Sequence, residues 1–117
     1  MKVKILGVTT EMDLEEFASP EMAEMHKDCV GRTIQAIEDA EDEPDSYEGL
    51  RLQCQAVVDA FAELFGEKDA REILGKRTNL FRCLDAFDEL VALYDRQVVP
   101  ALKKRGEKYN RARLNGR

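Results

Sequence analysis

Apolar residues recur at steps of three and four along most of the chain, a spacing that places them on one face of an α-helix. Three runs show this period: Met22, Met25, Cys29, Val30, Ile34 and Ile37; Leu50, Cys54, Val57, Val58, Phe61, Leu64 and Phe65; and Leu80, Leu84, Phe87, Leu90, Val91, Tyr94 and Val98. The intervening positions are mostly charged. The pattern therefore predicts three amphipathic helices, each with one apolar face.

Capping residues mark where these helices begin. Ser19-Pro20-Glu21 offers a side-chain cap, a proline at the first helical position and an acid at the positive end of the dipole. The first helix is therefore expected from Pro20 to Ala40. Asp45 to Glu48 has capping-box spacing and predicts the start of the second helix, and Thr78-Asn79 predicts the start of the last.

Glycine and proline mark where the helices end. Gly66 follows the second apolar run, and Gly75 follows a short third helix expected over residues 69–74. Pro44 falls in an acidic run that is expected to form an exposed loop. Pro100 lies within the last helical run, so we expect a kink or a stop there.

The first fourteen residues have a different period. Val3 and Ile5 alternate with Lys2 and Lys4, and Gly7 follows. This pattern predicts a short β-hairpin with its turn near Gly7, which must lean on helices because two strands alone are marginal in water. The expected fold is mainly α: a short N-terminal β-hairpin packed on a small bundle of three longer helices and one short one.

Charge is distributed unevenly along the 117 residues. Residues 100–117 carry seven cationic side chains and one carboxylate, a net charge of +6, so the total of −6 leaves −12 for residues 1–99. No apolar stripe continues beyond Arg105. The sequence therefore predicts a single helical domain over residues 1–105 and a basic, flexible arm over residues 106–117.

Length and composition indicate one soluble domain. A chain of 117 residues with 44% hydrophobic content can bury a core without staples. No apolar run approaches the roughly 20 residues of a membrane span, and no secretory signal opens the chain. Three cysteines without CxxC spacing favour a reducing compartment, so a cytoplasmic protein that does not contact membranes is expected.

The candidate chemistry is sparse. His26 and Cys29 have ligand spacing, and Cys54 and Cys83 would complete a zinc site. Each cysteine lies on the apolar stripe of a different helix, however, so core packing is the favoured interpretation. The lone histidine has no orienting partner for a nucleophile, and the acidic run lacks the spacing of a calcium loop. We therefore expect no enzyme, no metal and no cofactor.

Short motifs along nearly the whole chain resemble small proteins encoded in the tail-gene clusters of siphophages and their prophages. The resemblance rests on Asp13-Leu14 at the end of the hairpin, Phe61 to Phe65 with Gly66-Glu67, Ile73-Leu74-Gly75, Asn79-Leu80, Ala86-Phe87, and the closing Lys108-Tyr109-Asn110-Arg111-Ala112-Arg113. It implies a tail assembly chaperone: a small helical protein of the bacterial host cytoplasm that coats the tape-measure protein until the tail tube polymerises around it.

Under this hypothesis the partner is the tape-measure protein or another tail protein. The predicted client-binding residues are Met12, Phe17, Met22 and Met25, because methionine side chains adapt to varied apolar partners. The predicted contacts to the acidic face of a neighbouring copy in a homo-oligomer are Lys103, Lys104, Arg105, Lys108, Tyr109, Arg111 and Arg113.

Two alternatives stay open at the level of sequence. The three methionines can instead pack the hairpin against the bundle. The basic arm can instead bind phosphates, which would make the chain a small nucleic-acid-binding or regulatory module. The acidic body repels nucleic acid and so favours a protein partner.

Overall fold

The chain opens with the predicted hairpin. The computed structural model describes residues 1–77 and 79–115, with side chains as far as residue 107, and Thr78 of the predicted cap lies outside the described residues. Strands β1 (Lys2–Ile5) and β2 (Val8–Asp13) pair antiparallel, with Ile5 opposite Val8. Leu6 and Gly7 between them have φ angles of 50° and 78°, the two left-handed residues of a type I′ turn. The hairpin with its turn at Gly7 is confirmed.

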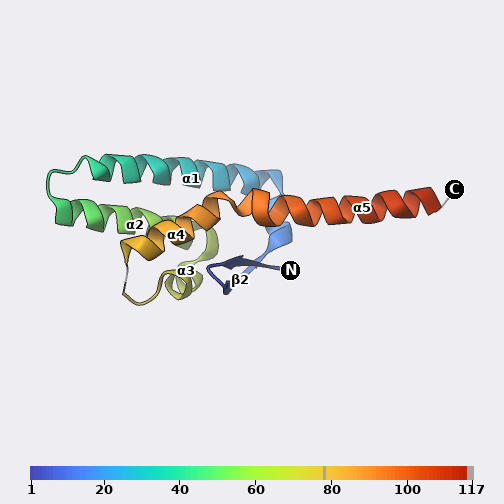
Figure 1. Cartoon of the computed structure of the whole chain (residues 1–117), viewed down its shortest axis with the longest axis horizontal. Coiled ribbons are helices and arrows are strands. Elements are labelled where there is room, and N and C mark those ends of the chain that lie inside the picture. Colours follow the sequence, from blue (N-terminus) through green and yellow to red (C-terminus); the bar gives the residue numbers. More distant parts are fainter. Residues whose placement is uncertain (78, 116–117) are drawn as a thin grey trace.

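Helices follow in the predicted order (Figure 1). They are α1 (Pro20–Glu41), α2 (Ser46–Phe65), the short α3 (Glu67–Leu74), α4 (Leu80–Val91) and α5 (Val99–Asn115), with a 3-10 turn η1 (Leu14–Ala18) before α1 and a π-helical turn η2 (Tyr94–Val98) before α5. The side chains of Ser19, Asp45 and Asn79 accept hydrogen bonds from the backbone of the helices that they precede. The mainly-α fold with an N-terminal hairpin is confirmed.

Helices α1 and α2 form an antiparallel pair, α4 packs on α2, and the hairpin lies beside α3 and α4 (Figure 1). The largest fully buried side chains come from the hairpin, η1, α2, α3, and α4 with the residues that follow it: Ile5, Phe17, Phe61, Ile73, Leu74, Leu90 and Leu93. Within the described part of the chain, no helix combines the length and the apolar character that a bilayer crossing requires.

Three polar side chains hold the hairpin on the bundle. Gln97 pairs with Lys4 on the open edge of β1: its Oε1 accepts from the backbone N–H at 3.2 Å and its Nε2 donates to the backbone carbonyl at 2.7 Å. Glu89 accepts from Leu6 N–H, and the buried Asp69 accepts from Glu11 N–H at 2.9 Å. Helical side chains thus satisfy backbone groups that a two-stranded sheet leaves unpaired.

Of the two outcomes expected near Pro100, a kink or a stop, the structure shows no stop. A π-helical turn comes just before the proline, and Val99 N–H bonds to the carbonyl of Tyr94, five residues back. Pro100 cannot donate a bond of its own, and a widened turn relieves the clash of its ring with the preceding carbonyls. The expected kink is therefore a change of direction between α4 and α5 (Figure 1), and the helix does not stop.

The predicted boundary between residues 105 and 106 is absent, because α5 continues as a helix to Asn115. Alanine, leucine, lysine, arginine and glutamate are good helix formers, and cations near a helix C-terminus complement its dipole. These local preferences extend the helix although it has no apolar stripe. The arm projects from the body as a single helix (Figure 1), and residues 116–117 lie outside the described residues.

Candidate protein-binding surfaces

Phe17 belongs to the core and not to the predicted client surface. Its side chain is fully buried, with its ring 5.6 Å from that of Phe65 and 6.4 Å from that of Tyr94. The Tyr94 hydroxyl donates to the Phe17 carbonyl at 2.6 Å. The turn η1 thus packs its aromatic residue inward between α2 and η2, and Phe17 cannot contact a partner.

The sequence allowed the methionines either to bind a client or to pack the hairpin against the bundle, and the structure divides them between these two roles by their exposure. Met12 and Met22 are half-buried and pack against the core, as expected if they join the hairpin to the bundle. Met25 alone of the predicted client residues is exposed, at 38%. The structure therefore does not bring Met12, Phe17, Met22 and Met25 together as one open surface.

A different apolar surface lies between α2 and α4. We call it the α2–α4 groove: a surface depression of about 500 Å³ lined by Leu50, Arg51, Cys54, Gln55, Val58, Asn79, Leu80 and Phe81. Phe81 is 83% exposed and Leu50 is 49% exposed, while Leu84, one turn after Leu80, is 39% exposed. Sequence reasoning missed this surface, although one signal was available: Phe81 is an aromatic residue that falls outside the apolar stripe of its helix.

The basic residues begin a second surface. Lys103, Lys104 and Arg105 are exposed at the base of α5, and Arg105 Nη2 lies 3.2 Å from Glu15 Oε1. Both side chains of this pair are about three-quarters exposed, so the ion pair contributes little stability. The predicted Lys108, Tyr109, Arg111 and Arg113 continue α5, and their side chains lie outside the described residues.

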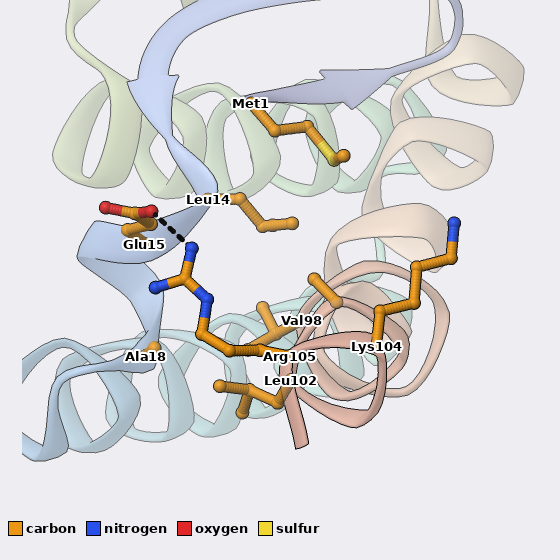
Figure 2. Close-up of a pocket in the computed structure, with 9 residues that line it drawn as sticks. Met1, Leu14, Glu15, Ala18, Val98, Leu102, Lys104 and Arg105 are labelled. Carbon is orange, nitrogen blue, oxygen red and sulfur yellow. Dashed lines mark hydrogen bonds and ion pairs between the residues drawn. The ribbon is translucent and has the colours of Figure 1, made fainter. Parts of the chain in front are cut away.

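These cations border what we call the α5 groove, a surface depression of about 510 Å³ between the hairpin end, η1 and α5 (Figure 2). Its lining residues are Met1, Leu14, Glu15, Ala18, Val98, Ala101, Leu102, Lys104 and Arg105. Figure 2 shows apolar side chains at its centre and the charged heads of Lys104 and Arg105 at its margins. The groove can therefore accept an apolar group and an adjacent anion.

Besides the two grooves, a third candidate surface is what we call the acidic tip, residues 38–45, where the chain passes from α1 to α2. Six of its eight residues are aspartate or glutamate, and five of these six are exposed. No lysine or arginine occurs between Arg32 and Arg51. Tyr47, which directly follows the tip, is 86% exposed.

The candidate zinc ligands His26, Cys29, Cys54 and Cys83 pack in or against the core. His26 is buried with its Nε2 2.7 Å from the Leu90 carbonyl, and Cys29 Sγ lies 3.8 Å from the Ala60 carbonyl. Burial raises the pKa of Cys29 to about 12, with a smaller contribution from the Glu63 carboxylate. Burial likewise raises the pKa of Cys83 to about 12, and the neighbouring Cys54 thiol adds to the effect.

Raised pKa values keep these thiols protonated at neutral pH, where they are poor nucleophiles and poor metal ligands. Among the residues that the structure describes, histidine, cysteine and carboxylate side chains nowhere form a group of three able to hold a metal ion. The exposed grooves and charged surfaces remain the candidate sites.

Comparison with known proteins adds a family. The model of DUF6673, a family of unknown function, matches residues 6–117. Searches of the curated proteins and of the solved structures found no match.

Proposed function

Because the chain belongs to DUF6673, a family of unknown function, we propose a function from its surface: a protein-binding module without enzymatic activity that acts as a tail assembly chaperone. Its client is the tape-measure protein, which it binds during phage tail morphogenesis in the cytoplasm of the bacterial host. The observation that carries this proposal is the α2–α4 groove with the exposed Phe81.

The groove has the character of a helix-binding surface. The Phe81 side chain is 83% exposed, so a partner can cover most of it. Each Å² of its apolar surface removed from water contributes about 25 cal/mol to the binding free energy. Leu50 and Val58 on α2 face Leu80 and Phe81 on α4 across the groove. An amphipathic helix laid along it would bury its apolar face against both.

A long helical client explains why such a surface is useful. Tape-measure proteins, as the resemblance implies, carry apolar stripes over long helices, and an uncovered stripe aggregates. A small protein that covers the stripe keeps its client soluble until the tube forms. Binding through apolar contacts also requires no catalytic group.

The test is co-expression with a candidate tape-measure protein from the genome that encodes this chain. The unaltered chain should keep the tape-measure protein in the soluble fraction, and Phe81→Ser should reduce that fraction about tenfold, because a central aromatic anchor is lost. Tyr47→Ser is the matched control: it removes an equally exposed aromatic residue outside the groove and should leave the soluble fraction unchanged.

The urea midpoint of both variants should match that of the unaltered chain, which separates loss of binding from loss of fold. A soluble fraction unchanged by Phe81→Ser would contradict the proposal.

The alternative is a nucleic-acid-binding module that uses the basic helix α5. Helix α5 extends away from an acidic body, which reduces the repulsion that the body would impose on phosphates. The two functions differ in their response to salt. Binding to a 30-base-pair duplex through α5 must weaken steeply between 50 and 200 mM NaCl, whereas apolar client binding should survive 500 mM NaCl.

A further inference from the structure

The molecule is polarised in charge along its longest axis. The chain extends over 68 Å in this direction and over 25 and 20 Å in the others. Figure 1 shows the loop between α1 and α2, which carries the acidic tip, at one end and α5 with the basic residues at the other. The two charged ends are thus too far apart to neutralise each other within one molecule.

The carboxylates on the α1 side of the acidic tip are unfavourable in an isolated molecule. These carboxylates crowd together, and Glu38, Asp39 and Glu41 stand in the last turn of α1, where the helix dipole is negative. Among the described side chains, no ion pair includes a residue of the tip. A cationic partner from outside the molecule would relieve this repulsion.

The α5 groove offers the complementary surface. Leu14, Val98 and Leu102 provide apolar area, and Lys104 and Arg105 stand at its margins (Figure 2). At the other end of the molecule, the exposed ring of Tyr47 adjoins Asp45, whose carboxylate caps α2 through Tyr47 N–H. One end thus presents an aromatic ring beside carboxylates, and the other presents an apolar groove beside two cations, one of which, Arg105, is paired with Glu15 on the groove wall.

We propose that copies of this chain associate head to tail, with the acidic tip of one copy docked in the α5 groove of the next. Tyr47 enters the groove, and the carboxylates of the tip meet Lys103, Lys104 and Arg105. Because the two surfaces differ and lie at opposite ends, the contact is heterologous and extends into a row of copies. The inference does not depend on the proposed client, because it uses neither Phe81 nor the α2–α4 groove.

Two half-defective variants of the full chain test the contact. The tip variant carries Tyr47→Ser, Glu38→Gln and Glu41→Gln, and the helix variant carries Lys103→Gln, Lys104→Gln and Arg105→Gln. Sedimentation velocity should show the unaltered chain as a concentration-dependent series of species in 50 mM NaCl and as the 13.3 kDa monomer in 500 mM NaCl.

Each variant alone should associate at least tenfold more weakly, because each lacks one side of the interface. Mixed in equal amounts, the two should form a dimer of about 27 kDa that grows no further, since the helix variant supplies an intact tip and the tip variant an intact groove. Substituting Glu21→Gln, Glu24→Gln and Val91→Ser is the matched control. It removes two exposed carboxylates of α1, the helix that also carries Glu38 and Glu41, and one exposed apolar residue of α4, and it should leave association unchanged.

A monomer at every concentration up to about 1 mM in 50 mM NaCl would overturn the proposal. So would a tip variant that associates as strongly as the unaltered chain, or a mixture that forms no dimer. Circular dichroism of each variant should match the unaltered chain, because every substituted residue is exposed or half-exposed. A variant that fails to fold is replaced by the single Tyr47→Ser substitution, which must still weaken association.

Discussion

His26 shows how a residue that suggests chemistry in the sequence can serve the fold. Its Nε2 lies 2.7 Å from the Leu90 carbonyl, which makes the ring nitrogen the donor, and its ring lies edge-on to Tyr94 at 4.8 Å. The histidine thereby joins α1 to the end of α4. The bond matters because the imidazole is buried and its Nε2–H has the Leu90 carbonyl as its acceptor.

Replacing His26 with phenylalanine should therefore lower the free energy of unfolding by about 0.5 to 1.5 kcal/mol, since it keeps a ring but removes the hydrogen bond to the Leu90 carbonyl. Urea denaturation at pH 7 measures the change. His26→Ala should cost more, because it also opens a cavity. Equal stabilities of the phenylalanine variant and the unaltered chain would show that the hydrogen bond contributes nothing.

The buried thiols predict a loss of stability in alkali. Cys29 and Cys83 have pKa values of about 12 in the folded chain against an ordinary value of 9.0, so the unfolded chain loses these protons first as the pH rises. Stability is unaffected below pH 9 and falls between pH 9 and 12. Each thiol should contribute a loss of about 1 kcal/mol at pH 10.

Burial also raises the pKa of Tyr94, which adds a loss of the same sign above pH 10. Urea denaturation at pH 8, 9 and 10 measures the slope for the unaltered chain and for a Cys29→Ala, Cys83→Ala double variant. The double variant should lose less stability between pH 8 and 10. Parallel slopes would refute the assignment.

At the scale of single residues, the sequence correctly predicted the burial of Cys29 and Cys83 and wrongly predicted an exposed Phe17. Cys29 and Cys83 lie on helical apolar stripes, and period alone indicates their burial. Phe17 lies among Glu15, Glu16 and Ser19, where no period is visible. Its burial depends on Tyr94, 77 positions later, whose hydroxyl bonds to the Phe17 carbonyl.

At the scale of elements, the hairpin turn depends on one glycine conformation. Gly7→Ala should lower the free energy of unfolding by about 1 to 2 kcal/mol, because the φ angle of 78° brings a Cβ against the following carbonyl. Gly31→Ala is the opposite control: Gly31 lies within α1 with nothing near its missing Cβ, so alanine should stabilise by about 0.5 to 1 kcal/mol. Thermal melts of the two variants should move in opposite directions.

Local signals located most elements. Caps at Ser19, Asp45 and Asn79 gave the starts of α1, α2 and α4, and Gly66 and Gly75 gave the ends of α2 and α3. The π-helical turn could not be predicted, because its cause is a compromise between Pro100 and the packing of Val98 and Tyr94 in the core. The contacts of Gln97 and Asp69 with the hairpin likewise require the tertiary arrangement.

At the scale of the whole molecule, α5 differs from the other helices because it stands away from the body (Figure 1). A polar helix without packing opens easily at its exposed end. Trypsin in 500 mM NaCl should therefore cut the chain beyond Arg105, in the exposed end of α5, well before it cuts the body, and mass spectrometry should find a stable product that ends close to Arg105. Earlier cleavage at Arg51 or Arg71 would contradict this view of the molecule.

The charge of each segment was evident from the sequence, but the separation of the charges in space was not. The end of the acidic run, Asp45, and the start of the basic run, Lys103, are 58 positions apart, a spacing compatible with neighbouring or opposite positions. The separation of the two charged runs in space depends on the change of direction between α4 and α5. The α2–α4 groove was hidden for a related reason, since a stripe shows which face of a helix is apolar but not how completely a neighbour covers it.

The π-helical turn determines how far α5 is rotated about the helix axis relative to the body. Relative to a regular α-helix it holds one additional residue, and one residue corresponds to about 100° of rotation about the helix axis. Shortening the segment 94–98 by a single position would turn α5 by that angle, moving Arg105 away from Glu15 and presenting a different row of side chains beside Leu14. A one-residue change in length is thus enough to turn the cationic side chains toward a different direction.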